Sequence, residues 1–112
     1  MAVDLGKRVV ETTQDSYYIE YDATNSRLII NFMSPNESVT EGGELSAFTL
    51  PEKFRPNANR YFFSAALTSE GNIMFCPFTI QADTGKIKLS SLNGKTIVAV
   101  YVMAVIGNYH IN

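Results

Sequence analysis

Short runs rich in β-branched and aromatic residues alternate along this chain with clusters of turn-forming residues. Seven such runs can be recognised, at residues 17–21, 27–33, 45–50, 60–68, 72–80, 86–90 and 96–106. The strongest turn signal between them is Asn93-Gly94, because a two-residue type I′ turn needs positive φ at both positions. No stretch of useful length repeats its apolar residues every 3.6 positions, so no helix is needed. The pattern predicts an all-β protein, an antiparallel β-sandwich or jelly roll.

Two of the runs are apolar on both faces. Residues 86–89 alternate between charged and apolar side chains, as a strand with one wet face does, but residues 60–68 and 96–106 do not. A two-sheet sandwich buries only its inner faces, so a loop, the N-terminal segment or another protomer must cover the second face of these strands. Because monomers rarely expose large apolar patches, self-association is favoured, and a charge at Val100 or Val102 is expected to disrupt it.

A connector with two prolines joins the third and fourth runs. It reads Leu-Pro-Glu-Lys-Phe-Arg-Pro over residues 50–56. Each proline fixes its own φ and disfavours helical backbone at the residue before it. The sequence therefore predicts a stiff, extended connector between two strands.

This Leu-Pro-x-x-Phe-Arg-Pro connector, the strand after it and the later turn Asp-Thr-Gly-Lys-Ile at residues 83–87 resemble the C-terminal modules of bacteriophage tail-fibre and baseplate receptor-binding proteins. The resemblance covers roughly residues 45–109. It implies a homotrimer around a threefold axis, made in the host cytoplasm and located in the tail or baseplate of a virion. The implied partners are other copies of the chain, other phage tail proteins and a host cell-wall or surface saccharide.

The pattern of polar and apolar residues suggests how the chain is divided. Residues 15–112 are expected to form the β-sandwich head domain. Residues 1–14 have mixed polarity and no clear period, and are expected to be a leader, an N-terminal strand or the cut end of a longer chain.

Composition and charge exclude several kinds of partner. At 112 residues the chain can bury the core of one domain, and a net charge of −2 without a run of Lys or Arg argues against nucleic acid. The longest apolar run, residues 97–106, is shorter than the roughly 20 residues of a membrane-spanning helix, so no membrane is expected. The single cysteine, Cys76, rules out an internal disulfide and is expected to be a buried small hydrophobe rather than a reactive thiol.

The sequence contains few of the residue patterns that catalysis requires. The single histidine, His110, lies near the end of the sequence, without the orienting carboxylate that a hydrolytic triad requires. Neither the spacing of metal ligands nor a phosphate-binding glycine loop is present, so no metal and no cofactor are expected. We therefore expect a protein that is not an enzyme.

Acidic residues offer two groupings, and neither points clearly to catalysis. The residues around Gly42-Gly43 are expected to form a solvated loop; they are Glu37, Glu41 and Glu44. A carboxylate pair for glycoside hydrolysis could be drawn from a second set, for which the sequence gives no separation to test: Glu20, Asp22, Glu70 and Asp83.

A binding surface is the remaining possibility. Proteins hold saccharides with a flat ring and hydrogen-bonding side chains on the loops of a rigid scaffold, and the chain has six tyrosines and seven phenylalanines. Two segments combine these residue types: Asn57, Asn59, Arg60 and Tyr61 after the connector, and Asn108, Tyr109 and His110 after the last strand. The alternatives are a polar turn with Arg60 at the surface, and a frayed tail with Tyr109 packed against the sheet. Tyr17 and Tyr18 form a weaker third option.

These observations predict a non-catalytic phage head module that recognises a host cell-surface saccharide. Individual sites would be weak, and many copies per virion would supply avidity. The alternative is a structural one, in which the same fold is a trimerising collar or spacer of the tail and contacts no host molecule.

Overall fold

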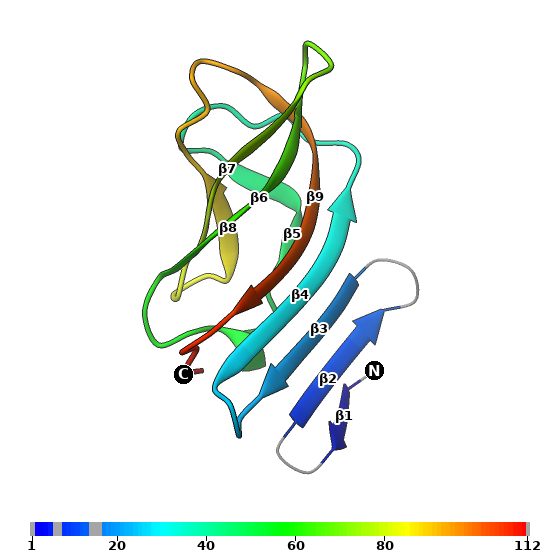
Figure 1. The fold of residues 1–112 in the computed structure, drawn as a ribbon, viewed down its shortest axis with the longest axis vertical. Helices are drawn as coiled ribbons and strands as arrows, with labels where there is room; N and C mark the ends of the chain where they lie inside the picture. The colour runs from blue at the N-terminus through cyan, green and yellow to red at the C-terminus, as the bar shows by residue number, and fades with distance from the viewer. Residues whose placement is uncertain (1, 6–7, 14–16, 112) are drawn as a thin grey trace.

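The computed structural model describes residues 2–5, 8–13 and 17–111, the first two of these ranges as backbone only. The described residues form one antiparallel sheet in the order β1-β2-β3-β4-β9-β6-β7-β8-β5 (Figure 1). The strands are β1 (Ala2–Leu5), β2 (Arg8–Thr13), β3 (Tyr17–Asp22), β4 (Arg27–Ser34), β5 (Glu44–Thr49), β6 (Arg60–Thr68), β7 (Ile73–Ile80), β8 (Lys86–Leu89) and β9 (Ile97–Ile106). One short 3₁₀ helix, η1 (Glu52–Phe54), lies between β5 and β6.

Each of the seven apolar runs becomes a strand whose bounds differ from the predicted ones by at most one residue. The predicted turn at Asn93-Gly94 is also confirmed, since both residues have positive φ, at 54° and 76°. An all-β antiparallel fold is therefore confirmed. The finer assignment to a β-sandwich or jelly roll stays a prediction.

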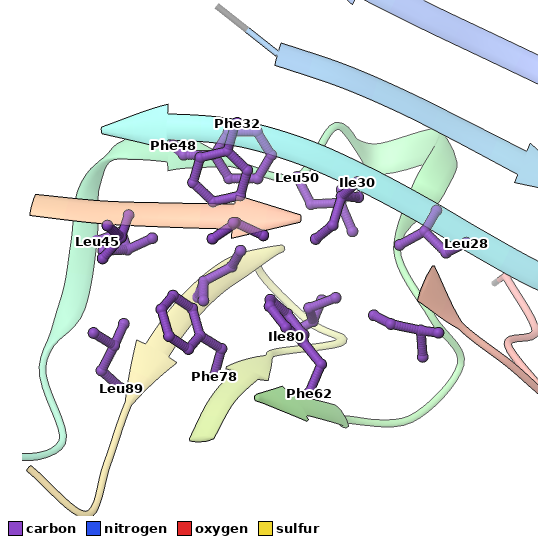
Figure 2. Packing of buried hydrophobic residues seen from close by; sticks show 14 of the residues in the cluster. Leu28, Ile30, Phe32, Leu45, Phe48, Leu50, Phe62, Phe78, Ile80 and Leu89 are labelled. Carbon is purple, nitrogen blue, oxygen red and sulfur yellow. The ribbon is translucent and has the colours of Figure 1, made fainter. Parts of the chain in front are cut away.

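The core lies inside the curl of this sheet. Figure 2 shows side chains from β4 converging with those of β5, β6, β7 and β8 on a common interior. The curl brings β5, the last strand of the sheet, over β4, where the rings of Phe48 and Phe32 stack 4.0 Å apart. Tyr17 of β3 meets the same Phe48 edge-on at 5.5 Å. Aromatic contacts of this kind add to the free energy gained by burial and help to fix β5 over β3 and β4.

A bulge in β9 changes which side chains of the last strand face the core. Leu67 of β6 pairs with Ala99 and Thr68 with Ile97, so Val98 is an extra residue in β9. A bulge of this kind shifts which side chains face inward. Consequently Val100 and Val102, 0% and 1% exposed, lie in the core. That a charge at either position disrupts assembly stays a prediction, and such a charge would also disrupt the core itself.

The N-terminal residues continue the sheet rather than cover it. β1 pairs with β2, and β2 pairs with β3 over six residues, which places this hairpin at one side of the molecule (Figure 1). The predicted boundary between residues 14 and 15 lies outside the described residues.

The connector is extended only at its ends. Pro51 and Arg55 have extended backbone, with ψ of 148° and 138°, but the residues between them form η1. Backbone hydrogen bonds from Phe54 to Pro51 and from Arg55 to Glu52 close this turn. The prediction of a continuously extended connector was therefore wrong in its middle. The turn points Phe54 into the core, where it is 1% exposed.

Candidate functional site

The two polar segments singled out in the sequence lie side by side. Pro56 forms a β-bridge with Ile111, and the Asn57 amide donates to the His110 carbonyl at 2.9 Å. The Arg60 guanidinium donates to the carbonyls of Gly107, at 2.9 Å, and Asn108. The end of the chain is thus tied to the start of β6, close to η1 in Figure 1.

Much of the chemistry of these segments is used within the fold. Tyr109 is fully buried, and its hydroxyl donates to the Phe54 carbonyl at 2.5 Å. Burial raises the pKa of this phenol, an effect that the positive charge of Arg60 offsets only in part. The Arg60 guanidinium lies 5.9 Å from the Tyr109 ring centroid, in a cation–π contact. Tyr109 is therefore packed in the core, and no part of it is available at the surface.

The other predicted residues remain at the surface. The Asn59 side-chain oxygen accepts a hydrogen bond from the Ala82 amide at 2.9 Å, which pins the β7–β8 turn. Asn57 is exposed, and His110 lies 3.1 Å from the Asn108 side-chain oxygen. Tyr61 is 65% exposed.

The weaker option, Tyr17 and Tyr18, has partners within the fold. Tyr17 packs against the core, and the Tyr18 hydroxyl donates to the carboxylate of Glu20.

A polar hollow lies next to these segments, and the sequence analysis did not predict it. It is lined by Glu52, Lys53 and Arg55 from the connector and by Ala82 and Asp83 from the β7–β8 turn. Its volume of about 740 Å³ is in the range of ligand pockets. A signal was present in the sequence, because the two walls are the two motifs that carry the family resemblance.

The two motifs contact each other through Gly85. The Leu50 amide donates to the Gly85 carbonyl at 2.9 Å, and Arg55 Nε donates to the Leu50 carbonyl at 3.3 Å. Gly85 has a φ of +75°, and a Cβ there would lie 2.4 Å from the Leu50 oxygen and 2.6 Å from Arg55 Nε. Only glycine fits both requirements. The Pro-rich connector and the Asp-x-Gly turn are therefore one packing unit.

A second surface lies on the outer face of the strands β4, β9, β6 and β7. Here Met33, Tyr101, Ala65 and Phe75 follow one another across four neighbouring strands. No described residue covers this face. We call its exposed apolar side chains the outer patch: Met33, Tyr61, Phe63, Ile73, Phe75, Tyr101, Met103 and Val105.

Of the acidic residues near Gly42-Gly43, Glu41 and Glu44 are exposed, whereas Glu37 is buried and anchors the chain. The buried Glu37 carboxylate accepts hydrogen bonds from the Ser34 hydroxyl, the Ser46 amide and hydroxyl, and the Ala47 amide, at 2.6–3.1 Å. Burial alone would raise its pKa, but these donors together outweigh it and lower the pKa. Glu41 accepts from the amides of Ser91 and Leu92, both at 2.7 Å.

The remaining acidic residues do not gather into one site. The Asp22 carboxylate accepts a hydrogen bond from Asn25 and forms an ion pair with Arg27. Glu70 forms an ion pair with Lys95 at 2.6 Å, and it lies in a turn at the opposite end of β7 from Asp83. Within the part of the chain that the structure describes, no three His, Cys, Asp or Glu residues gather where a metal ion would fit. The described residues also include no helix with the length and apolar character to span a membrane.

Cys76 is buried, as expected. Burial, and to a lesser extent the negative charge of Glu41, raise the pKa of its thiol to about 11. The thiolate form is therefore scarce at neutral pH.

Comparisons with protein-family models, with curated protein sequences and with solved structures found no match to this chain.

Proposed function

We propose that this protein is a non-catalytic head module of a phage tail fibre or baseplate, a β-sandwich or jelly-roll unit that assembles as a homotrimer and recognises a host cell-surface saccharide. The observation that carries the proposal is the outer patch. The resemblance of the connector and the Asp-x-Gly turn to tail receptor-binding modules supports it, as does the contact between these two motifs at Gly85.

The outer patch is large enough to form a stable interface. With about 200 Å² for each whole side chain, its exposed fractions of 41–79% correspond to an area on the order of 1,000 Å². The largest apolar patch of a typical monomer is about 300–600 Å². A stable protein–protein interface buries about 800 Å² on each partner. The patch thus exceeds the first value and meets the second.

The chemistry of the patch favours further copies of the same chain as its partner. The outward positions of β9, β6 and β7 carry no charged side chain. Such a surface provides neither the charge pattern that attracts an unlike partner nor the repulsion that would keep identical copies apart. Turned toward a threefold axis, the face would pack against both neighbouring protomers.

The test is the mass in solution, measured by light scattering during size-exclusion chromatography. Three chains of 12.4 kDa give about 37 kDa, which is the expected mass of the wild type. Met103→Lys and Phe63→Asp should each shift it to 12.4 kDa. Asn36→Lys, which introduces a charge at an exposed position outside the patch, should leave it at the trimer value. A monomeric wild type would overturn the assembly part of the proposal.

A collar or spacer without a host ligand is the second candidate, since the outer patch would support its assembly equally well. Adsorption separates the two. Purified trimer should compete with intact phage for host cells if the module recognises its receptor, and should leave adsorption unchanged if it is a spacer.

A further inference from the structure

The polar hollow between the connector and the β7–β8 turn has the properties of a preformed binding site. Its walls come from segments about 30 residues apart in the sequence, Glu52 to Arg55 and Ala82 to Asp83. None of its lining residues belongs to the outer patch. Assembly through the patch and binding in the hollow are therefore separate properties, which separate variants can test.

Both walls of the hollow are held rigidly. Phe54, between two lining residues, is anchored in the core, and its carbonyl accepts the Tyr109 hydroxyl. On the other wall, the Ala82 amide is bound by Asn59, and the Gly85 amide donates to the Gln81 carbonyl at 2.8 Å. Ligand binding would thus cost little ordering of the backbone, which is how a preorganised site gains affinity.

The hollow contains hydrogen-bonding groups that the fold leaves unused. Among the described residues, the carboxylates of Glu52 and Asp83 have no hydrogen-bond or ion-pair partner. Arg55 uses only its Nε, toward the Leu50 carbonyl, which leaves both terminal NH₂ groups as donors. Acceptors and donors therefore face one space without neutralising each other.

The balance of charge selects the class of ligand. Among the described lining residues, the carboxylates of Glu52 and Asp83 face the free terminal groups of the Arg55 guanidinium, so the hollow offers charges of both signs. A polyanion would meet Glu52 and Asp83, and a cation would meet Arg55. A neutral sugar meets neither penalty: two neighbouring hydroxyls can both donate to one carboxylate, and a guanidinium can donate to hydroxyl and ring oxygens.

We propose that this hollow binds a neutral oligosaccharide, with Glu52 and Asp83 accepting hydrogen bonds from sugar hydroxyls and Arg55 donating to sugar oxygens. The inference rests on the proposed function, in that it places saccharide recognition in the hollow rather than on the tail segment around Asn108 and His110. None of the described lining residues is aromatic, so hydrogen bonds carry the recognition. Because sugars also form such bonds with water, each single site should be weak.

The experiment uses an oligosaccharide array followed by titration calorimetry on the ligands that bind. The array presents neutral hexose and N-acetylhexosamine oligomers beside uronic acid and glycerol-phosphate oligomers. The wild type should bind neutral members, with an affinity that changes less than twofold between 50 and about 500 mM salt, because no net charge is paired. Preference for the anionic members, with affinity falling as salt rises, would overturn the assignment.

Variants then locate the site. Glu52→Ala and Asp83→Asn should each weaken binding about tenfold or more, which is the loss of one hydrogen bond to a charged group. Glu70→Gln, an exposed acid in the turn at the other end of β7, is the matched control and should bind like the wild type. Equal affinity in all three variants would place the site elsewhere. Thermal unfolding should be unchanged in the two hollow variants, since neither side chain has a partner within the described fold.

The possible failures can be told apart by the mass. If correctly assembled wild type binds no member of the array, the hollow proposal is overturned while the assembly proposal stands, and the spacer function gains support. If the wild type is monomeric and binds neutral sugars, and Glu52→Ala weakens this binding, the hollow proposal stands and the assembly proposal fails.

Discussion

Replacing Tyr109 by phenylalanine removes one oxygen atom from the best-buried part of the C-terminal segment. The ring keeps its place in the core, but the Phe54 carbonyl loses the hydroxyl that donates to it. A buried acceptor left without a partner costs about 1–3 kcal/mol. We therefore expect Tyr109→Phe to lower the free energy of unfolding by about 2 kcal/mol.

Two measurements quantify this loss. At about 1–3 kcal/mol per molar urea for a small domain, a loss of 2 kcal/mol moves the urea midpoint down by roughly 1 M. The thermal midpoint should fall by about 8 °C, since 1 kcal/mol corresponds to roughly 4 °C at this chain length. Both must be compared at one protein concentration, because the stability of an oligomer depends on it.

Tyr61→Phe is the matched control. It removes the same atom from a ring that is 65% exposed, and should change stability by less than about 0.5 kcal/mol. If the two variants unfold alike, the hydrogen bond to Phe54 contributes nothing and the reasoning fails. Tyr109→Ala, by contrast, empties a fully buried site at a cost of about 3–5 kcal/mol. A loss of host adsorption in that variant would therefore report unfolding and not a missing ligand contact.

Two further predictions concern Glu37 and Gly85. Because the pKa of Glu37 is lowered in the folded state, its contribution is complete above the ordinary value of 4.5 and is lost as pH falls through the folded pKa. Glu37→Gln should thus destabilise by about 2 kcal/mol at pH 7 in urea denaturation, with a gap to wild type that narrows below pH 4.5; a gap constant with pH would contradict this. Gly85→Ala should cost about 2 kcal/mol or more, since it combines a positive φ with a clash against the Leu50 carbonyl. Gly71→Ala is its control, with a φ of +88° but open space around the Cβ, and equal losses in the two variants would show that the contact with Leu50 does not matter.

The positions of the strands could be predicted from the sequence because they depend on local signals. Alternating residues such as Lys86 to Leu89 and the turn at Asn93-Gly94 specify strand and turn without help from distant contacts. Which face of β9 is buried could not be predicted, because the bulge at Val98 is set by its pairing with β6. With both parities apolar, the sequence offers nothing to reveal that shift.

The candidate site was predictable only in part, for a similar reason. The sequence placed polar side chains at Asn57 to Arg60 and at Asn108 to His110, and the structure brings the two segments together. The sequence alone could not show that the Tyr109 side chain points into the core, since an aromatic ring at the end of a strand can either pack in a core or contact a ligand. The hollow beside Arg55 was missed because its walls meet only through tertiary packing.

The Glu37 carboxylate has a consequence for how copies of this protein avoid one another. Within the described part of the chain, β5 is the last strand of the sheet and pairs only with β8, and such an edge can template the addition of a foreign strand. The amides of Ser46 and Ala47 within β5 are already bound to Glu37, and the register of β5 is irregular along this stretch. These two amides are therefore not available to an incoming strand, and the irregular backbone of β5 would not match a regular strand. Edge-to-edge addition of another chain at β5 is therefore disfavoured. Contact between the faces of the sheets does not meet this obstacle.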